Sequence, residues 1–192
     1  MSKSATQLAH VNDRVLNAAM QVLLAVGASL FVALCARVTV PLPFTPVPLT
    51  LQNFAVLLIG LSLGARRGFA ALVLYLAEGM FGLAVFNPTG AGGLAQLAGP
   101  TGGFLLAYPF VAGIAGLLME SGKRTFARAA VAASLAEVVL FVGGLSWLVI
   151  LTHSFMQALR FGLYWFVFAE IIKVMVAAGL VAGWQRIRKV QE

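Results

Sequence analysis

Apolar residues run along this chain in six long blocks that are separated by short polar or irregular segments. The blocks cover about residues 16–36, 49–63, 68–86, 104–119, 129–151 and 159–184. A helix needs about 20 apolar residues to cross the hydrocarbon core of a bilayer, and the blocks reach or approach this length. The pattern therefore predicts an all-α membrane protein with six transmembrane helices, which together form one integral membrane domain over residues 1–192.

Two connections between the blocks have unusual compositions. Residues 41–48 contain four prolines, which lack an amide hydrogen and restrict the residue before them. Residues 87–103 are rich in glycine and carry no charge. With six spans, both connections lie on the outer side of the membrane. Plain surface loops are one interpretation, but ordinary loops are more polar than residues 91–103, and loops beyond about 12–15 residues are usually functional or disordered. We therefore expect two long, non-helical outer loops that cap a ligand pocket.

The composition agrees with a membrane protein. Hydrophobic residues make up 61% of the chain and charged residues only 10%, with a mean hydropathy of +0.97, whereas soluble domains carry about 25% charged residues. The net charge of +7 does not indicate a nucleic-acid partner, because the basic residues lie scattered at the ends of apolar blocks.

The distribution of basic residues predicts the orientation in the membrane. With six spans and a cytoplasmic N-terminus, two basic residues lie outside, Arg37 and Arg160, and Lys173 lies within the membrane. The cytoplasmic segments then hold the other ten: Lys3, Arg14, Arg66, Arg67, Lys123, Arg124, Arg128, Arg186, Arg188 and Lys189. Since cytoplasmic loops carry an excess of lysine and arginine, we expect both termini in the cytoplasm.

The sequence offers little for catalysis. Its two histidines, His10 and His153, belong to no cluster with metal-ligand spacing, and no serine or cysteine has a plausible base beside it. The single cysteine, Cys35, cannot form an intrachain disulfide. No phosphate-binding glycine loop with the required lysine and hydroxyl is present. We therefore expect no enzyme, no cofactor and no metal, and a first apolar block that is retained as a helix.

The strongest candidate for a functional site is a charged pair within the last apolar block. Glu170 and Lys173 are three residues apart and therefore share one helical face. Charges in the hydrocarbon region cost at least about 2.5–3.5 kcal/mol each on insertion scales, and such residues are functional candidates by default. The pair either neutralises itself against a neighbouring helix or binds a ligand that carries charge and hydrogen-bonding groups.

Other residues are expected to converge on this pair. Gln52 and Asn53 begin the second block on the outer side and place two amides below the outer loops. Aromatic residues are available to wall an apolar ligand body, namely Phe104, Tyr108, Trp147 and Trp165. A mostly apolar cavity with a few placed polar groups is typical of a small-molecule site.

Three further features have more than one interpretation. Glu78 precedes a glycine and is expected either at a packed interface or in a functional role, and Glu137 is expected to pair with Arg128 or to reach toward the cytoplasm. Ala25 and Ser29 are spaced four residues apart on the first helix and allow another helix to approach closely. That helix belongs either to this chain or to a partner protein.

Two motifs carry a resemblance to a known family. Residues 45–53 read Thr-Pro-Val-Pro-Leu-Thr-Leu-Gln-Asn, and residues 99–105 read Gly-Pro-Thr-Gly-Gly-Phe-Leu. Together with the acid-x-x-lysine pattern of Glu170 and Lys173, they resemble BioY, the biotin-binding S component of energy-coupling factor (ECF) vitamin transporters. The resemblance covers about residues 22–181. It implies a six-helix protein in the cytoplasmic membrane of a prokaryote, which binds biotin from outside with high affinity.

The resemblance also implies site residues and partners. Carried over by motif, the ligand-binding candidates are Gln52, Asn53, Gly99, Thr101, Phe104, Glu170 and Lys173, to which we add Tyr108 and Trp147 as apolar walls. The implied partners are a transmembrane coupling protein and a pair of cytoplasmic ATPases, with Ala25 and Ser29 on the docking surface. Ala91 departs from relatives with a polar residue there, so its side chain is not a candidate.

Two other functions compete with vitamin binding. An ion-coupled secondary transporter of a small carboxylate-bearing solute would use Glu78, Glu137 and Glu170 as a relay, although the sequence shows no inverted repeat. A membrane assembly factor would instead pair its intramembrane charges with another protein.

Overall fold

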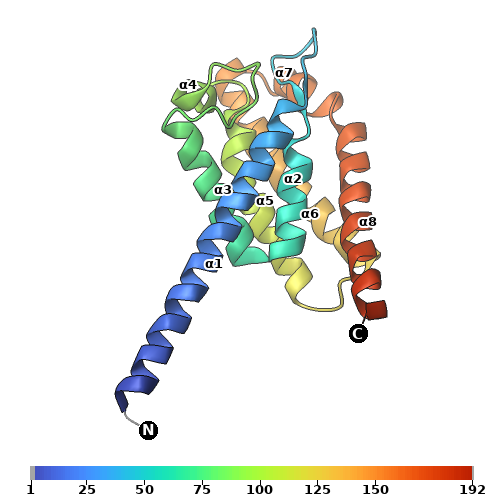
Figure 1. Ribbon diagram of the computed structural model, residues 1–192. Coiled ribbons are helices and arrows are strands. Elements are labelled where there is room, and N and C mark those ends of the chain that lie inside the picture. The colour runs from blue at the N-terminus through green and yellow to red at the C-terminus, as the bar shows by residue number, and fades with distance from the viewer. Residues whose placement is uncertain (1–2, 192) are drawn as a thin grey trace.

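Most of the described chain forms long helices that alternate in direction (Figure 1). The computed structural model describes residues 3–191, without the side chains of residues 3–13, 15, 185, 186 and 188–191. Lys3, Arg186, Arg188 and Lys189, which enter the charge count, thus lie outside the described side chains. The long helices are α1 (Lys3–Arg37), α2 (Gln52–Leu63), α3 (Ala65–Met80), α5 (Gly102–Glu120), α6 (Phe126–Thr152) and α8 (Val167–Gln191).

Three irregular connections gather at one end of the bundle, at the top of Figure 1. The first is an antiparallel pair of two-residue strands, β1 (Thr39–Val40) and β2 (Leu49–Thr50), which brackets the proline-rich loop. The second is the glycine-rich segment, and the third joins α6 to α8. The opposite end carries the short connections around Gly64 and residues 121–125, so the unusual segments do share one side of the fold.

The glycine-rich segment differs from the prediction that it is non-helical. It contains the short helix α4 (Gly93–Ala98), and α5 already begins at Gly102. Side-chain contacts order this segment, because the Gln96 carboxamide accepts a hydrogen bond from the Gly92 amide at 3.1 Å. The pattern of apolar residues cannot predict local hydrogen bonds of this kind.

The predicted bounds of three further helices were also wrong. The second block does not start as a helix at residue 49, because Leu49 and Thr50 pair with β1. The third helix ends at Met80 rather than residue 86, and residues 81 and 82 form a turn in which Gly82 has φ +88°. The sixth block divides into α7 (Phe155–Leu159), a π-helical turn η1 (Arg160–Tyr164) and α8.

Four helices are long and apolar enough to cross a membrane: Leu16–Arg37 within α1, Gly102–Glu120, Phe126–Thr152 and Val167–Trp184 within α8. Helix α2 has 12 residues and α3 has 16, which correspond to about 18 and 24 Å. Both are shorter than the hydrocarbon core of about 30 Å. Within the described residues the structure is therefore helical apart from the short β1–β2 pair, with four spans of sufficient length, and two of the six predicted spans are short.

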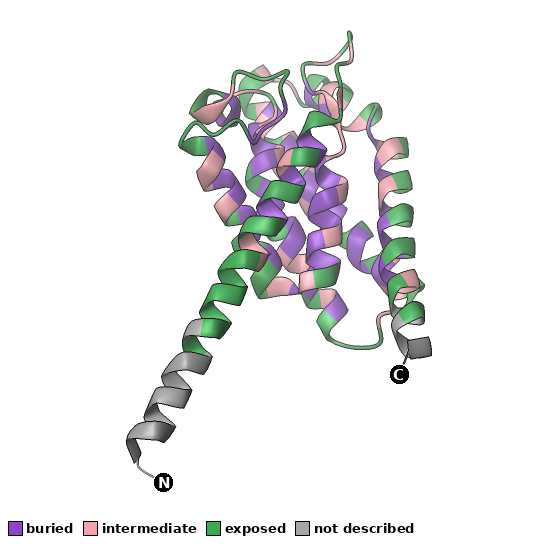
Figure 2. Ribbon diagram, viewed as in Figure 1, coloured by how far each residue is buried: buried purple, intermediate pink, exposed green. Residues whose placement is uncertain are grey.

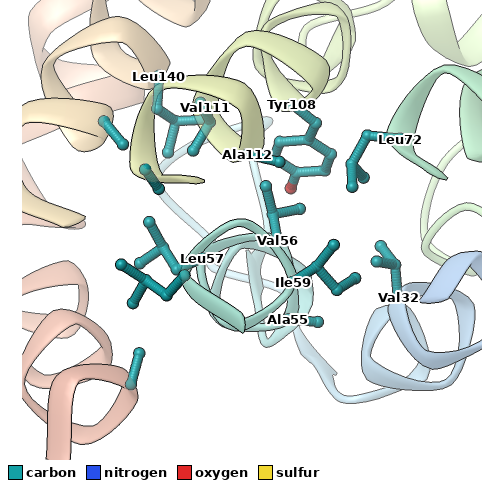
Figure 3. Close-up of a cluster of buried hydrophobic side chains, with 14 of the residues drawn as sticks. Val32, Ala55, Val56, Leu57, Ile59, Leu72, Tyr108, Val111, Ala112 and Leu140 are labelled. Atoms are coloured by element: carbon teal, nitrogen blue, oxygen red, sulfur yellow. The ribbon is translucent and has the colours of Figure 1, made fainter. Parts of the chain in front are cut away.

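Helix α2 stands at the centre of the core (Figure 3). Its apolar residues point to several sides, as expected for a helix with neighbours on most of its faces. Val56 and Ile59 face Tyr108, Leu72 and Val32 on the neighbouring helices. By contrast, long stretches of α1 and the outer face of α8 are exposed (Figure 2). Large apolar side chains cover these exposed surfaces, as is expected where a helix faces lipid.

Glycines allow the central helices to approach closely. A Cβ atom added at Gly60 on α2 would lie 2.5 Å from the carbonyl oxygen of Ala112 on α5. Gly68 on α3 is also close to α2, although less tightly, because its added Cβ would lie 3.3 Å from the Gly60 Cα. Small residues at such crossings are typical of helix packing in membranes. This packing fixes α2 against α3 and α5 and so positions the first turn of α2.

Candidate ligand-binding site

A cleft opens where the first turn of α2 meets the three connections. The cleft is narrow in this structure, with a cavity volume of about 50 Å³. A bulkier ligand therefore requires the walls to move apart. The lining residues are Val47, Pro48, Thr50, Gln52, Asn53, Asn87, Thr101, Phe104, Leu105, Tyr108, Leu140, Phe141, Phe166, Glu170 and Lys173.

Asn53 is the centre of a buried polar cluster in this cleft. Its Nδ2 donates one hydrogen bond to Glu137 Oε1 at 2.5 Å and another to Glu170 Oε2 at 2.7 Å. These bonds join α2 to α6 and α8, so one amide links three helices. All three side chains are buried, and in such surroundings satisfied hydrogen bonds rigidify the core.

Lys173 and Glu170 form an ion pair, which is one of the two interpretations that the sequence left open. The Lys173 Nζ lies 2.7 Å from Glu170 Oε1, and the two side chains are 11% and 8% exposed. Glu170 thus accepts from Lys173 with one oxygen and from Asn53 with the other. Because an ammonium has three donor hydrogens, Lys173 keeps donor capacity toward the cleft that it lines.

Gln52 lies in a second chain of hydrogen bonds. Its Nε2 donates to the Tyr75 hydroxyl at 2.5 Å, and that hydroxyl donates to the Val85 carbonyl at 3.0 Å. This chain connects α2 through α3 to the segment that precedes the glycine-rich loop. The Gln52 oxygen stays available on the cleft wall.

Two of the predicted site residues lie outside the cleft wall. The Trp147 indole nitrogen donates to the Gly99 carbonyl at 3.0 Å and so ties α6 to the glycine-rich segment. Thr101, Phe104 and Tyr108 do line the cleft, as expected. The structure therefore gives Gly99 and Trp147 a supporting position behind the predicted binding residues.

The connections also hold one another at the rim. The Thr45 hydroxyl donates to the Phe161 carbonyl at 2.7 Å, and the ring centroids of Phe44 and Trp165 lie 4.1 Å apart. The proline-rich loop is thereby joined to η1 and to the start of α8. Trp165 stands at this rim rather than among the aromatic walls.

Sequence reasoning missed Glu137 as a member of the polar cluster. The expected pairing with Arg128 is wrong, because Arg128 donates to the Leu118 carbonyl and to the Ser121 hydroxyl. Glu137 instead points toward Asn53 and Glu170. The only sign of this role in the sequence was an ionisable residue in the middle of an apolar block, and it did not indicate which neighbouring helix the Glu137 side chain faces.

The outward docking face expected at Ala25 and Ser29 is corrected in part. Ser29 is fully buried, and its hydroxyl donates to the Glu78 carboxylate. Ala25 is half-buried against the main core. The small residues thus serve internal packing of α1 against α3, and they also give Glu78 its partner at an interface between helices.

Comparison with known proteins decides the family. The sequence model of the BioY family matches residues 3–190. The chain belongs to the BioY family. Among curated relatives, the "Probable biotin transporter BioY" of Pyrococcus horikoshii is 35% identical over 150 residues, 78% of this chain and 88% of the relative. The "Biotin transporter BioY" of Rhizobium etli is 36% identical over 165 residues, 82% of this chain and 88% of the relative.

A solved structure has the same fold. The "Crystal structure at 2.1 A of the S-component for biotin from an ECF-type ABC transporter" matches with a TM-score of 0.77. The match covers 90% of this chain and 93% of that chain, at 23% sequence identity. Together with the four long apolar helices, membership in the BioY family makes this chain a multi-pass membrane protein of a prokaryote.

Proposed function

We propose that this protein binds biotin in the cleft and takes it up across the cytoplasmic membrane, as the substrate-binding subunit of an ECF-type transporter. The observation that carries the proposal is the charged and amide cluster in the wall of an otherwise apolar cleft, in a chain of the BioY family. Biotin joins a carboxylate to a fused ring system with a polar ureido group. A cleft that combines one ammonium with amides and aromatic rings complements both ends of this ligand.

The lining residues suggest how the ligand is held. Lys173 offers its remaining ammonium hydrogens to the ligand carboxylate, which is a charge-assisted hydrogen bond. Gln52, Thr101 and Glu170 supply acceptors and donors for the ureido group. Phe104 and Tyr108 cover the apolar part of the ligand. We assign Asn53 to the orientation of Glu170 and assign Gly99 and Trp147 to the support of the loop.

The arrangement in the membrane follows from the same function. We propose that all six long helices span the bilayer as one domain over residues 1–192, with α2 and α3 completed by the ordered connections that cap the cleft. The ten-to-two distribution of basic residues favours cytoplasmic termini and an outward-facing cleft. The protein has no catalytic step of its own in this scheme, so a coupling protein and an ATPase pair supply the energy.

The coupling protein requires an exposed apolar surface on this subunit. A groove of about 390 Å³ between α1 and α2 is lined by Leu23, Gly27, Phe31 and Leu58, among others. This groove includes the face of α1 next to Ala25, and we place the contact with the coupling protein there rather than at Ser29.

The carboxylates do not favour an ion relay. Glu78 is bonded to Ser29 between α3 and α1, whereas Glu137 and Glu170 meet at Asn53 between α6, α8 and α2. A relay would need these groups to be connected, and the two sets belong to separate hydrogen-bond networks.

Equilibrium binding to the purified full-length protein tests the proposal. We expect tight retention of biotin and weaker retention of an analogue without the carboxyl group. Absence of biotin binding by folded wild-type protein would refute it. Uptake into liposomes driven by an ion gradient without ATPases would instead support a secondary transporter.

A further inference from the structure

The polar cluster contains more negative than positive charge when all of its groups are ionised. Glu137 and Glu170 are both buried, and both accept a hydrogen bond from the same Asn53 nitrogen. Lys173 is bonded to Glu170. Two ionised carboxylates and one ammonium would therefore leave one uncompensated charge in the cluster. An isolated buried charge is so costly that the group usually neutralises instead.

Among the described side chains, the neighbouring helices supply no second cation to Glu137. The charged groups close to it are Glu170 and Lys173, both on α8. Among the described residues, helix α2 contributes the neutral amide of Asn53, and α5 contributes the buried phenol of Tyr108. On α6 itself, Arg128 is engaged with Leu118 and Ser121. The compensation thus has to come from a proton within the cluster.

Two buried oxygen atoms show where this proton belongs. Among the described side chains, Asn53 Oδ1 and Glu137 Oε2 are the two buried polar atoms without a hydrogen-bond partner. Both are acceptors when Glu137 is ionised, so they cannot bond to each other. When Oε2 carries a proton, it becomes a donor. Because Asn53 Nδ2 already donates to Glu137 Oε1 at 2.5 Å, the two groups can then close a cyclic acid–amide pair.

We infer that Glu137 holds a proton in the ligand-free protein and forms this cyclic pair with Asn53. One proton then gives a hydrogen-bond partner to both Asn53 Oδ1 and Glu137 Oε2, and it removes the excess negative charge. The second Nδ2 hydrogen of Asn53 stays on Glu170, which remains ionised and paired with Lys173.

The protonated Glu137 acts as a positioning residue, and this role rests on the proposed biotin function. It stands behind the cleft, whose wall includes Asn53, Glu170 and Lys173. Glu137 lines a separate side cleft of about 230 Å³ between α6 and α8. By fixing the orientation of Asn53, it fixes Glu170 and so holds the Lys173 ammonium toward the ligand carboxylate.

Substitutions at Glu137 distinguish a neutral acid from a carboxylate. Glu137→Gln reproduces the neutral pair, because its amide donates to Asn53 Oδ1 and accepts from Nδ2. We expect biotin affinity within a few-fold of wild type. Glu137→Ala leaves both polar groups of Asn53 short of partners, and we expect the Kd to rise roughly 5- to 150-fold. Glu170→Gln is the matched control, since it removes the ionised partner of Lys173 and is expected to weaken binding.

The pH profile gives a second readout. Ionisation of Glu137 removes the donor to Asn53 and adds a negative charge, so wild-type affinity should fall as the pH rises into the alkaline range. Glu137→Gln retains Lys173 and Tyr108 but lacks this group, and its affinity should fall less over the same range. Identical alkaline profiles for wild type and Glu137→Gln would overturn the inference, as would a Glu137→Gln affinity as poor as that of Glu137→Ala.

Infrared difference spectroscopy detects the proton without any ligand. The carbonyl stretch of a protonated carboxyl should be present in the ligand-free wild type and lost in Glu137→Gln. A spectrum unchanged by this substitution would overturn the inference even if Glu137→Ala failed to fold. If the wild type showed the carboxyl band but bound no biotin, the proposed function would fail while the protonated pair stood.

Discussion

Replacement of Lys173 by methionine removes the ammonium from the cleft while it retains an unbranched side chain. Lys173 is 11% exposed and bonded to a buried carboxylate, so the small values of about 0–1 kcal/mol for surface ion pairs do not apply. Truncation of a buried, hydrogen-bonded charge contact typically costs about 2–5 kcal/mol. At about 1.4 kcal/mol per tenfold, we expect the Kd for biotin to rise from about 30-fold to several thousand-fold.

The same substitution also affects stability, and a second variant separates the two effects. Lys173→Met leaves the Glu170 carboxylate buried with only the Asn53 hydrogen bond. An uncompensated buried charge of this kind costs about 3–5 kcal/mol. Glu170→Gln in the same molecule removes that charge. We therefore expect the double variant to recover thermal stability in detergent but not biotin affinity.

Isothermal titration with biotin and with its des-carboxyl analogue measures the role of the ammonium directly. Wild type should prefer biotin, and Lys173→Met should bind the two ligands with nearly equal affinity. The reasoning is refuted if Lys173→Met still prefers biotin by the wild-type factor. It is also refuted if the double variant regains the affinity as well as the stability.

Two further predictions concern the support of the site. Gly60→Ala places a Cβ atom 2.5 Å from the Ala112 carbonyl oxygen and should cost about 1–3 kcal/mol of stability. At Gly179 nothing lies within 4 Å of an added Cβ atom, so Gly179→Ala should not lower the melting temperature. Equal losses of stability in both variants would contradict the close-packing argument. Trp147→Phe removes the 3.0 Å hydrogen bond to the Gly99 carbonyl. Because such a bond contributes about 0.5–1.5 kcal/mol, biotin should dissociate about 2- to 10-fold faster in a stopped-flow displacement assay. An unchanged dissociation rate would mean that this bond does not hold the loop.

Much of the site could be predicted from residues close together in the sequence. The spacing of Glu170 and Lys173 places them on one helical face, and the structure confirms their contact at 2.7 Å. Gln52 and Asn53 begin a helix at the end where the irregular connections gather, so both line the cleft. These predictions succeeded because helix periodicity and the alternation of membrane-crossing helices determine the directions of such residues.

Contacts between residues far apart in the chain could not be predicted from the sequence. Glu137 joins Asn53 across 84 positions, and Ser29 joins Glu78 across 49. Apolar blocks rich in small residues give no preferred face, so the rotation of each helix about its axis stays undetermined until the helices pack. The pairing of β1 with β2 and the π-helical turn before α8 likewise depend on contacts among the connections.

The membrane class, the family and the presence of a charged pair in an apolar helix therefore follow from the amino-acid sequence, because composition, motif and local periodicity are properties of short stretches of chain. Which helices face one another depends on the packing of the folded chain. That choice follows from close approach at small residues such as Gly60. It is this packing that brings a second carboxylate, Glu137, to the amide of Asn53 and so turns one ion pair into a four-residue cluster.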